Sequence, residues 1–458
     1  MKFKFKNLGY IDKGELEIGN LTVICGANNV GKTYISYSIF GFLSQFENLF
    51  DFDIKKEILG TLYDKGVCQI DLTEYEQTLP QALKEASRHY AEFLPTVFGA
   101  EEDFFEGFEF EALVGNKLGN SKKPVEKTLV SKQKEVLKIV KKPNSKVLEV
   151  YFLGESKEDF FDSMFVEKIL NESLADVLLG DYFMEPFVVT SERTGISLFF
   201  KELDINKNVL IEQFKKLGKS DIINPFEILK EMVSRYPLSI KHNINRTRDY
   251  DVIAKKKSFL LKENSESSKQ LFKLWEGIAN GNFRMVKNEI FHTPKKERGR
   301  KRPNPIPIYM SSSAVKSLAL MDIYIRNIAK EGDLLLIDEP ELNLHPGNQL
   351  LMARFLARLV NKGINVLITT HSDYLIKEFN NLIMLSNEFP GKTYLMKKYG
   401  YIVDEILDKA KVKAYTVSHH HTIEEASIDK FGIALDSFDD VILNVNKISD
   451  ELYLQIEG

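Results

Sequence analysis

The sequence has little cysteine and no long apolar run, and both absences narrow the class of protein. Only Cys25 and Cys68 occur among 458 residues, so no disulfide framework is expected. No apolar run approaches the ~20 residues of a membrane-spanning helix, and residues 1–25 lack the unbroken apolar region of a signal peptide. We therefore expect a cytoplasmic protein that does not associate with a membrane.

The chain also lacks a strong net charge. Its formal charge of −4 gives no global signature of nucleic-acid binding, so any basic surface has to be local. The hydrophobic fraction of 43% and the charged fraction of 28% are those of an ordinary globular chain. The length suits about two or three domains.

Two adjacent acids, Asp338 and Glu339, follow the apolar run Leu334–Ile337, which is typical of a buried strand. Uncompensated charge at the end of such a strand would cost several kcal/mol, so paired carboxylates have no structural use there. A magnesium ion beside a phosphate does have a use for them, because Asp338 can hold the metal and Glu339 can polarise a water. This interpretation requires a phosphate-binding loop elsewhere in the chain.

The segment Gly26–Thr33 is that loop, since it matches the Walker A pattern in full. It follows the short apolar strand predicted at Leu21–Cys25 and opens a predicted helix. The helix has one apolar face, which is formed by Ile35, Ile39, Phe42 and Phe46. The strand, loop and helix context of a P-loop is therefore present.

The chemistry of a P-loop assigns a role to each residue type in it. Backbone N–H groups of the loop, which includes Asn28, Asn29 and Gly31, approach the phosphates, and the helix N-terminus adds a favourable dipole. Lys32 is expected to reach the β- and γ-phosphates, and Thr33 to ligate Mg²⁺ together with Asp338. The sequence thus predicts binding of ATP with Mg²⁺.

A serine-rich segment, Ser311–Ser317, begins a predicted helix shortly before the acid strand. Its serines have a plain structural interpretation, because serine is a preferred helix cap. They also have a functional one, since a serine-rich helix start is an anion site. In that case Ser312 and Ser313 would contact the γ-phosphate of a nucleotide held by another P-loop.

A histidine ends the next predicted strand, Ile364–Thr370. Residues at the carboxyl ends of strands in an α/β sheet face the ligand crevice, so we expect His371 there. A basic cluster, Lys295–Arg302, precedes the serine helix in a proline-containing segment that suits a hairpin or mobile loop. The cluster is either a solvated surface or a contact for phosphates or an acidic partner.

Four segments together resemble the ABC-type ATPase head of the SMC, RecF and OLD (overcoming lysogenization defect) group. They are Gly26–Thr33, Ser311–Ser317, Leu334–Pro346 and Thr370–Ser372. The resemblance implies an α/β fold, namely a P-loop NTPase with an ABC-type head of mixed sheet, lobes I and II, and a helical arm insertion.

The same resemblance implies a division of the chain into four parts. Lobe I with the P-loop would span residues 1–197, and a helical arm residues 198–285. Lobe II, with the signature serines, the acid strand and the switch histidine, would span residues 286–390. A C-terminal α+β subdomain would follow at residues 391–458.

The resemblance further implies two heads that close head-to-tail around two ATP molecules. Lys32, Thr33 and Asp338 of one subunit would hold Mg·ATP, and Ser312 and Ser313 of the other would contact its γ-phosphate. Glu339 would position the attacking water, and His371 would sense the γ-phosphate. The expected activity is hydrolysis of ATP to ADP and phosphate by a homodimer or higher homo-oligomer.

What the heads control is open between three readings. The segment Glu339–Pro346 is similar to OLD-like ATPases of bacterial defence, and the part after His371 is shorter than the nuclease domain of OLD proteins. This favours an anti-phage ATPase that resembles the ATPase subunits of the PARIS, Septu or AbiL-type systems, responds to DNA or a phage protein, and governs a separate nuclease or toxin effector. The alternatives are a RecF-like ATPase for DNA repair or chromosome maintenance, and an ATP-dependent assembly scaffold with little turnover.

Overall fold

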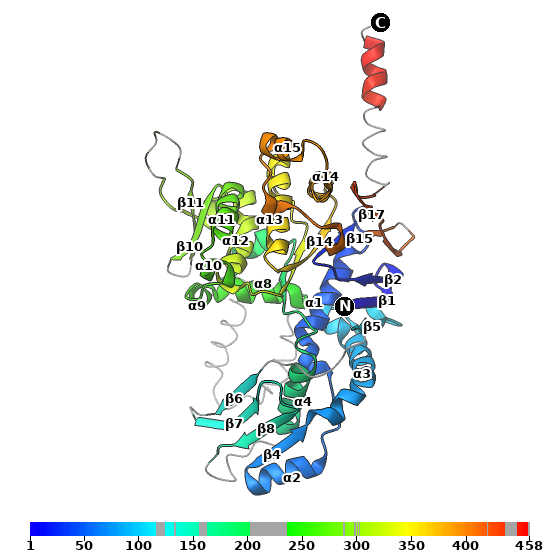
Figure 1. The fold of residues 1–458 in the computed structure, drawn as a ribbon, viewed down its shortest axis with the longest axis vertical. Coiled ribbons are helices and arrows are strands. Elements are labelled where there is room, and N and C mark those ends of the chain that lie inside the picture. Colours follow the sequence, from blue (N-terminus) through cyan, green and yellow to red (C-terminus); the bar gives the residue numbers. More distant parts are fainter. Residues whose placement is uncertain are drawn as a thin grey trace, which may run out of the picture. The chain divides into compact units, whose positions relative to one another are not determined.

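The computed structural model describes residues 1–115, 124–131, 134–154, 163–201, 236–286, 289–296, 299, 301, 303–418, 420–435 and 447–456. The chain forms two compact units, and Figure 1 labels their elements. Unit 1 comprises Met1–Glu17, Ser38–Val97 and Glu101–Pro186. Unit 2 comprises Ile18–Tyr37, Phe98–Ala100 and Phe187–Gly458.

Unit 1 contains two antiparallel sheets with strand orders β2-β1-β5 and β4-β8-β7-β6. Its strands are β1 (Lys2–Leu8), β2 (Ile11–Glu17), β4 (Val67–Asp71), β5 (Glu109–Leu113), β6 (Val125–Ser131), β7 (Lys134–Lys141) and β8 (Val147–Phe152). Its helices are most of α1 (Lys32–Leu49), α2 (Lys56–Lys65), α3 (Leu72–Phe98), the short η1 (Glu102–Phe105) and α4 (Ser163–Leu179).

Aromatic rings form the core of unit 1 around Phe110. The ring centroid of Phe110 lies 4.7 Å from that of Tyr90, 5.0 Å from that of Phe42 and 5.8 Å from that of Phe3. Phe3 and Phe5 alternate along β1 with exposed lysines, as a strand with one buried face requires.

Unit 2 is organised around a six-stranded sheet of order β16-β15-β3-β14-β13-β9. The strands are β3 (Leu21–Cys25), β9 (Pro186–Val189), β13 (Leu334–Asp338), β14 (Asn365–Thr370), β15 (Val412–Val417) and β16 (Ile423–Glu425). The pairs β15-β3, β3-β14 and β14-β13 are parallel, whereas β16 runs antiparallel to β15. The predicted α/β class with a mixed sheet is therefore confirmed.

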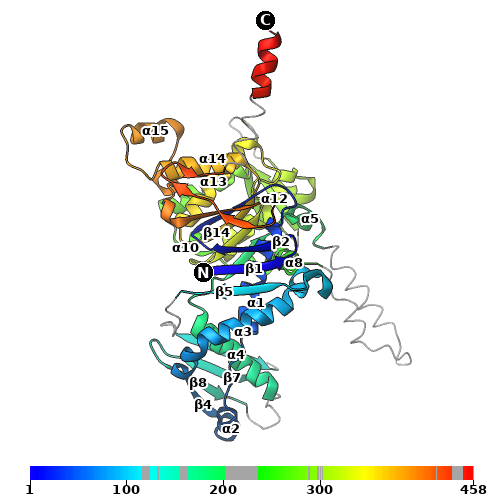
Figure 2. The ribbon, with the colours of Figure 1, turned by 90° about the vertical axis from the view of Figure 1, so that its right-hand side faces the viewer.

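Helices and short strands complete unit 2 (Figures 1 and 2). The helices are the start of α1, α5 (Arg193–Phe199), α8 (Leu238–Arg248), α9 (Tyr250–Ile253), α10 (Phe259–Lys262), α11 (Glu266–Ile278), α12 (Ser313–Ile323), α13 (Pro346–Asn361), α14 (Asp373–Met384) and α15 (Lys392–Tyr399). Short turns occur at η4 (Ile308–Met310), the π-helical η5 (Tyr324–Ile328), η6 (Val403–Glu405) and η7 (Lys409–Lys411). The small strands are β10 (Gly281–Val286), β11 (Glu289–Pro294), β12 (Ile306–Pro307), β17 (Ile428–Asp429) and β18 (Gly432–Ile433), and residues 447–456 form a further helix.

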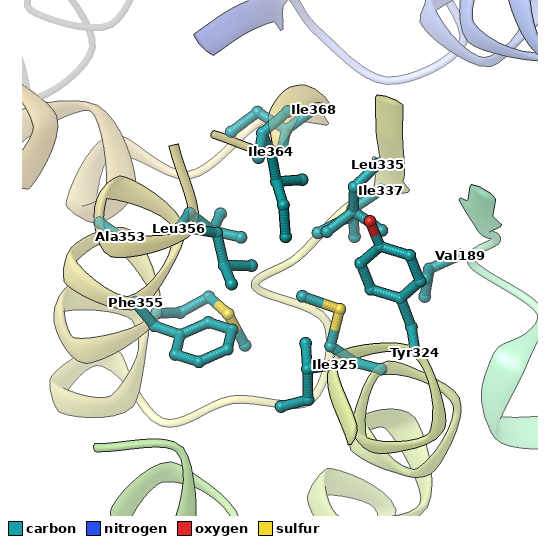
Figure 3. Close-up of a cluster of buried hydrophobic side chains, with 14 of the residues drawn as sticks. Val189, Tyr324, Ile325, Leu335, Ile337, Ala353, Phe355, Leu356, Ile364 and Ile368 are labelled. Carbon is teal, nitrogen blue, oxygen red and sulfur yellow. The ribbon is translucent and has the colours of Figure 1, made fainter. Parts of the chain in front are cut away.

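One face of the central sheet packs against helices α12 and α13 (Figure 3). Every second residue of a strand points to the same face, so Leu335 and Ile337 of β13 join Ile368 of β14 there. Phe355 of α13 and Tyr324 lie opposite them. This packing fixes the position of the sheet edge at which the functional side chains lie.

The segment that the sequence predicts as a helical arm is described only in part. Residues 202–235 lie outside the described residues. Helices α8, α10 and α11 follow, and their side chains Ile244, Leu260 and Trp275 belong to the buried core of unit 2. The described part of the predicted arm is therefore built into the core.

The segment 391–458, predicted as a separate α+β subdomain, contributes β15 to the central sheet. Thr416 of β15 is paired with Cys25 of the P-loop strand. The sequence pattern of residues 412–417 does not reveal this pairing, because a strand pattern carries no information on its neighbour. The C-terminal segment thus borders the P-loop directly.

Lys295 and Lys296, which begin the basic cluster, follow strand β11. β11 pairs antiparallel with β12, with Phe291 opposite Pro307. Lys295 and Lys296 are exposed, whereas Arg298, Arg300 and Arg302 lie outside the described residues. Across the described part of the chain, no helix has the length and apolarity needed to cross a membrane.

Candidate active site

Three polar segments follow three neighbouring parallel strands of unit 2. The P-loop follows β3, the acids end β13, and His371 follows β14. The register pairs Asp338 with Thr369 and Thr370 with Cys25, so the three strands end at the same level. Carboxyl ends of parallel strands are the usual place for a ligand. The structure therefore brings the P-loop, the paired acids and the histidine to one edge of the sheet.

The P-loop turns sharply between β3 and α1. Gly26 has φ +156°, and a Cβ at this position would lie 2.8 Å from the carbonyl oxygen of Val417 at the end of β15. Only glycine allows so close an approach of two backbones. Asn28 and Asn29 are exposed at the tip of the loop, where Asn29 has φ +64°, and Gly31 has φ +104°. The loop leaves its tip open to a ligand.

Lys32 lies in the P-loop with its side chain 7% exposed. Its Nζ donates to the carbonyl oxygens of Gly26, at 2.9 Å, and Ala27, at 2.7 Å. Burial lowers the pKa of Lys32, while the carboxylates of Glu339 and Asp338 act in the opposite direction. An arriving phosphate would replace the two carbonyls with charged acceptors, which form stronger hydrogen bonds.

Thr33 and Asp338 form an oxygen pair that fits a magnesium ion. Thr33 Oγ1 lies 3.2 Å from Asp338 Oδ2, and Thr369 Oγ1 donates to Asp338 Oδ1. Neighbouring ligands of an octahedral Mg²⁺ at about 2.1 Å lie about 3 Å apart, so this spacing suits two adjacent coordination positions. Burial is the main reason why the pKa of Asp338 is raised, and the charge of Glu339 adds to it. A divalent cation would compensate that buried charge.

Glu339 stands next to Asp338 in an uncommon backbone conformation. Its φ is +52°, in the left-handed region that costs a non-glycine residue about 1–2 kcal/mol. Its N–H donates to the carbonyl oxygen of Thr369 at 3.1 Å. Its Oε1 lies 3.4 Å from Nδ1 of His371, whose side chain is 44% exposed. The acid and the histidine are thus adjacent at the open side of the site.

A third acid, Glu341, is buried next to the histidine and accepts hydrogen bonds from the strand end that carries it. It is 5% exposed and accepts hydrogen bonds from Thr370 Oγ1 at 2.6 Å and from the backbone N–H of His371 at 3.0 Å. Its Oε1 also lies 3.6 Å from His371 Nδ1. The sequence alone indicates no role for Glu341, although this residue lies two positions after Glu339.

The serines lie at the start of α12. Ser312 is the N-cap residue, and its side chain accepts from the N–H of Val315 at 3.3 Å. Both Ser312 and Ser313 are exposed. Among the described residues no hydrogen bond joins either serine to the P-loop or to the paired acids. The capping interpretation holds in the structure, and the exposed hydroxyl of Ser313 is available to a ligand from outside.

Arg193 is a site-adjacent residue that sequence reasoning missed. It begins α5, four residues after Val189 at the end of β9, and is 3% exposed. Its guanidinium donates to the backbone carbonyls of Asp338, at 2.7 Å, and Glu339, at 2.6 Å. Its position in a polar turn after a buried strand is the same signal that marked the acids and His371.

A protein-family comparison bears on the same region. The family model described as AAA ATPase domain matches residues 187–376. Residues 187–376 are thus similar to an ATPase domain. The matched range contains Arg193, the serine helix, the acid strand and His371, and the P-loop lies before it.

A curated relative and several solved structures are also similar to this chain. A Caldanaerobacter subterraneus subsp. tengcongensis protein, named as an ABC transporter ATP-binding protein, is 30% identical over 112 residues. The match covers 24% of this chain, and the chain spans 43% of the length of that relative.

Two SMC head domains illustrate the similar solved structures. The head from Thermotoga maritima is 9% identical, with 93% of this chain and 98% of that chain covered and a TM-score of 0.31. A head with an extended coiled coil, bound to the C-terminal domain of ScpA derived from Pyrococcus furiosus, is 12% identical. It covers 98% of both chains with a TM-score of 0.33.

Proposed function

We propose that the protein binds and hydrolyses ATP with Mg²⁺ as an ABC-type head that dimerises head-to-tail around the nucleotide. The observation that carries this proposal is the oxygen pair of Thr33 and Asp338, 3.2 Å apart, beside Glu339 and His371 at the same edge of the sheet. A P-loop, a magnesium site and a water-positioning acid are the parts that phosphoryl transfer to water requires.

The residues divide the reaction ATP + H₂O → ADP + phosphate between them. Thr33 and Asp338 would hold Mg²⁺, which neutralises charge on the phosphates when bound. Lys32 would leave its carbonyl acceptors for the β- and γ-phosphates. Glu339 would orient the attacking water, and His371 would donate a hydrogen bond to the γ-phosphate. Phosphoryl transfer depends mostly on such positioning and charge compensation.

The dimer would complete each site from two chains. Ser312 and Ser313 are exposed at the N-terminus of α12, where a helix dipole favours an anion. Tyr309 and Met310, which precede them, are 60% and 68% exposed. Exposed apolar side chains beside a polar site are typical of an interface, so this surface suits a second copy of the chain.

The cellular role of this ATPase activity is a second proposal. We infer an anti-phage ATPase of the cytoplasm that senses DNA or a phage protein and regulates a separately encoded nuclease or toxin. The support is the likeness of Glu339–Pro346 to OLD-like ATPases. Co-purification of the tagged chain with the product of a neighbouring gene tests this role, and full activity in isolation without any bound partner would argue against it.

The first experiment on the activity is Glu339→Gln. The amide keeps the size of the side chain but cannot orient a water as a carboxylate does, so turnover should fall by about 10²-fold or more while ATP binding persists. Steady-state phosphate release and light scattering with and without Mg·ATP measure both properties. The variant should accumulate as an ATP-bound dimer. Turnover at the parental rate would remove Glu339 from the reaction.

A further inference from the structure

All three nitrogens of the Arg193 guanidinium donate hydrogen bonds to backbone carbonyls. Nε donates to the carbonyl oxygen of Ser317 at 3.1 Å, and Nη1 donates to those of Thr190, at 3.0 Å, and Asp338, at 2.7 Å. Nη2 donates to the carbonyl oxygen of Glu339 at 2.6 Å. The planar, rigid fork of arginine can satisfy such divergent acceptors at once, which the single ammonium of lysine cannot do.

The four hydrogen bonds of the Arg193 guanidinium all reach backbone carbonyls, although three carboxylates lie close enough to act on its charge. Burial lowers the pKa of Arg193, and the negative charges of Asp338, Glu341 and Glu339 act against that shift. A buried charge is costly unless it is well hydrogen-bonded. The four carbonyl contacts meet that requirement, so their geometry is held firmly.

These carbonyls belong to elements with different tasks. Ser317 lies on α12, whose N-terminus carries the exposed serines, whereas Asp338 and Glu339 end the acid strand. One turn after Arg193, Ser197 Oγ lies 3.0 Å from the carbonyl oxygen of Lys316 and 2.8 Å from that of Arg193, and its hydroxyl can donate to either. Helix α5 therefore contacts α12 at two consecutive backbone carbonyls, those of Lys316 and Ser317.

The contact with Glu339 has a particular consequence. The left-handed φ of Glu339 persists only because its surroundings hold it, since a non-glycine residue pays for this conformation. The Glu339 N–H is held by Thr369, and the Glu339 carbonyl by Arg193. A shift of the guanidinium would release one of these two restraints and reorient the carboxylate.

We infer that Arg193 couples the serine helix to the water-positioning acid, and thereby couples the two nucleotide sites of the dimer. This inference rests on the proposed head-to-tail ATPase. In that dimer, Ser312 contacts the nucleotide of the partner, whereas Glu339 of the same chain acts on its own. A movement of α12 on the partner's nucleotide would pass through Arg193 to the backbone of Glu339. Arg193 is thus a positioning residue that makes hydrolysis at one site depend on occupancy of the other.

The test is Arg193→Lys, which keeps the charge but loses the fork. ATP affinity, measured with a fluorescent ATP analogue, should stay within about threefold, because the hydrogen bonds of the Arg193 guanidinium go to Thr190, Ser317 and the two acids and not to the P-loop. We expect kcat to fall about tenfold or more, since small misplacements of a catalytic group have such effects, and the Hill coefficient for ATP to fall toward 1. In an E339Q background, dimerisation with Mg·ATP should persist.

Arg358→Lys is the matched control for the loss of a buried arginine. Arg358 is 9% exposed and donates to Glu405 Oε1 and to the carbonyl oxygen of Gln270 at 2.9 Å. Arg358→Lys should lower Tm as much as Arg193→Lys does and leave kcat and the Hill coefficient at their parental values. Ser197→Ala removes a hydroxyl that lies 3.0 Å from the carbonyl oxygen of Lys316 and 2.8 Å from that of Arg193. If Arg193→Lys does not fold, Ser197→Ala should lower kcat and the Hill coefficient in a chain that still folds.

The outcomes separate the coupling from the activity. A parent protein without ATPase activity or ATP-driven dimerisation would contradict the proposed function itself. A parent that hydrolyses ATP with a Hill coefficient of 1 would overturn the coupling alone. So would a cooperative parent whose Arg193→Lys and Ser197→Ala variants keep the parental kcat and Hill coefficient.

Discussion

Burial raises the pKa of Asp338, a residue that is 4% exposed at the end of β13. A group with a raised pKa in the folded state contributes stability below its ordinary pKa of 3.8, and this contribution is lost as the pH rises through the folded value. At neutral pH and without metal, the ionised carboxylate therefore lowers the free energy of unfolding. The residue that suits Mg²⁺ makes the metal-free protein less stable.

Asp338→Asn should consequently stabilise the metal-free protein at pH 7 and abolish hydrolysis. Thermal unfolding without Mg²⁺ should show a Tm about 2 °C above that of the parent. In a chain of this size, such a shift corresponds to a gain of at most about 1 kcal/mol in the free energy of unfolding. The difference should shrink as the pH is lowered, because the parent then gains its proton. A Tm at or below that of the parent at pH 7 would contradict the argument.

At the scale of the element, helix α12 has one residue with two possible roles. Ser312 caps the helix in the structure, and it is also proposed to face a partner's γ-phosphate. Alanine would not separate the roles, since the lost cap alone costs about 1 kcal/mol. Aspartate separates them, because it is an equally good cap but repels a phosphate.

Ser312→Asp should therefore keep the parental Tm and lose ATP-driven dimerisation and turnover. Ser265→Asp is the matched control, because Ser265 caps α11 in the same way, with its side chain accepting from the N–H of Ser268 at 3.1 Å. The control should keep both Tm and activity. Normal turnover in Ser312→Asp would show that Ser312 only caps the helix and does not contact the γ-phosphate.

Some elements of the fold can be predicted from the sequence, and others cannot. The strands Leu21–Cys25 and Leu334–Asp338 are predictable, because unbroken apolar runs mark strands that are buried on both faces. The contact of Arg193 with Asp338 is not, since it joins backbone carbonyls that carry no sequence signature. The pairing of β15 with β3 is equally hidden, because a period-two pattern predicts a strand but not its neighbour.

At the scale of the whole molecule, dimerisation should depend on the apolar pair beside the serines. Met310 is 68% exposed, and a charge there would be desolvated on closure of the dimer. Met310→Asp in an E339Q background should remain monomeric by light scattering with Mg·ATP, at concentrations where the E339Q parent is dimeric.

Val403→Asp provides the comparison for this variant. Val403 is 74% exposed in the turn Val403–Glu405, away along the chain from the serine helix. This control should dimerise normally, and both variants should keep the parental Tm because neither position is buried. A dimer that forms equally well with Met310→Asp would place the contact between copies on another surface.

The position of β3 between β14 and β15 has a consequence for synthesis on the ribosome. The strand Leu21–Cys25 emerges early, yet its neighbours Asn365–Thr370 and Val412–Val417 are translated hundreds of residues later. Until then the backbone hydrogen-bonding groups and the mostly apolar side chains of this strand have no partner strand, which favours aggregation of nascent chains and calls for chaperones. Chains released before Val417 would lack the carbonyl that lies against Gly26, so prematurely terminated products should fail to retain nucleotide.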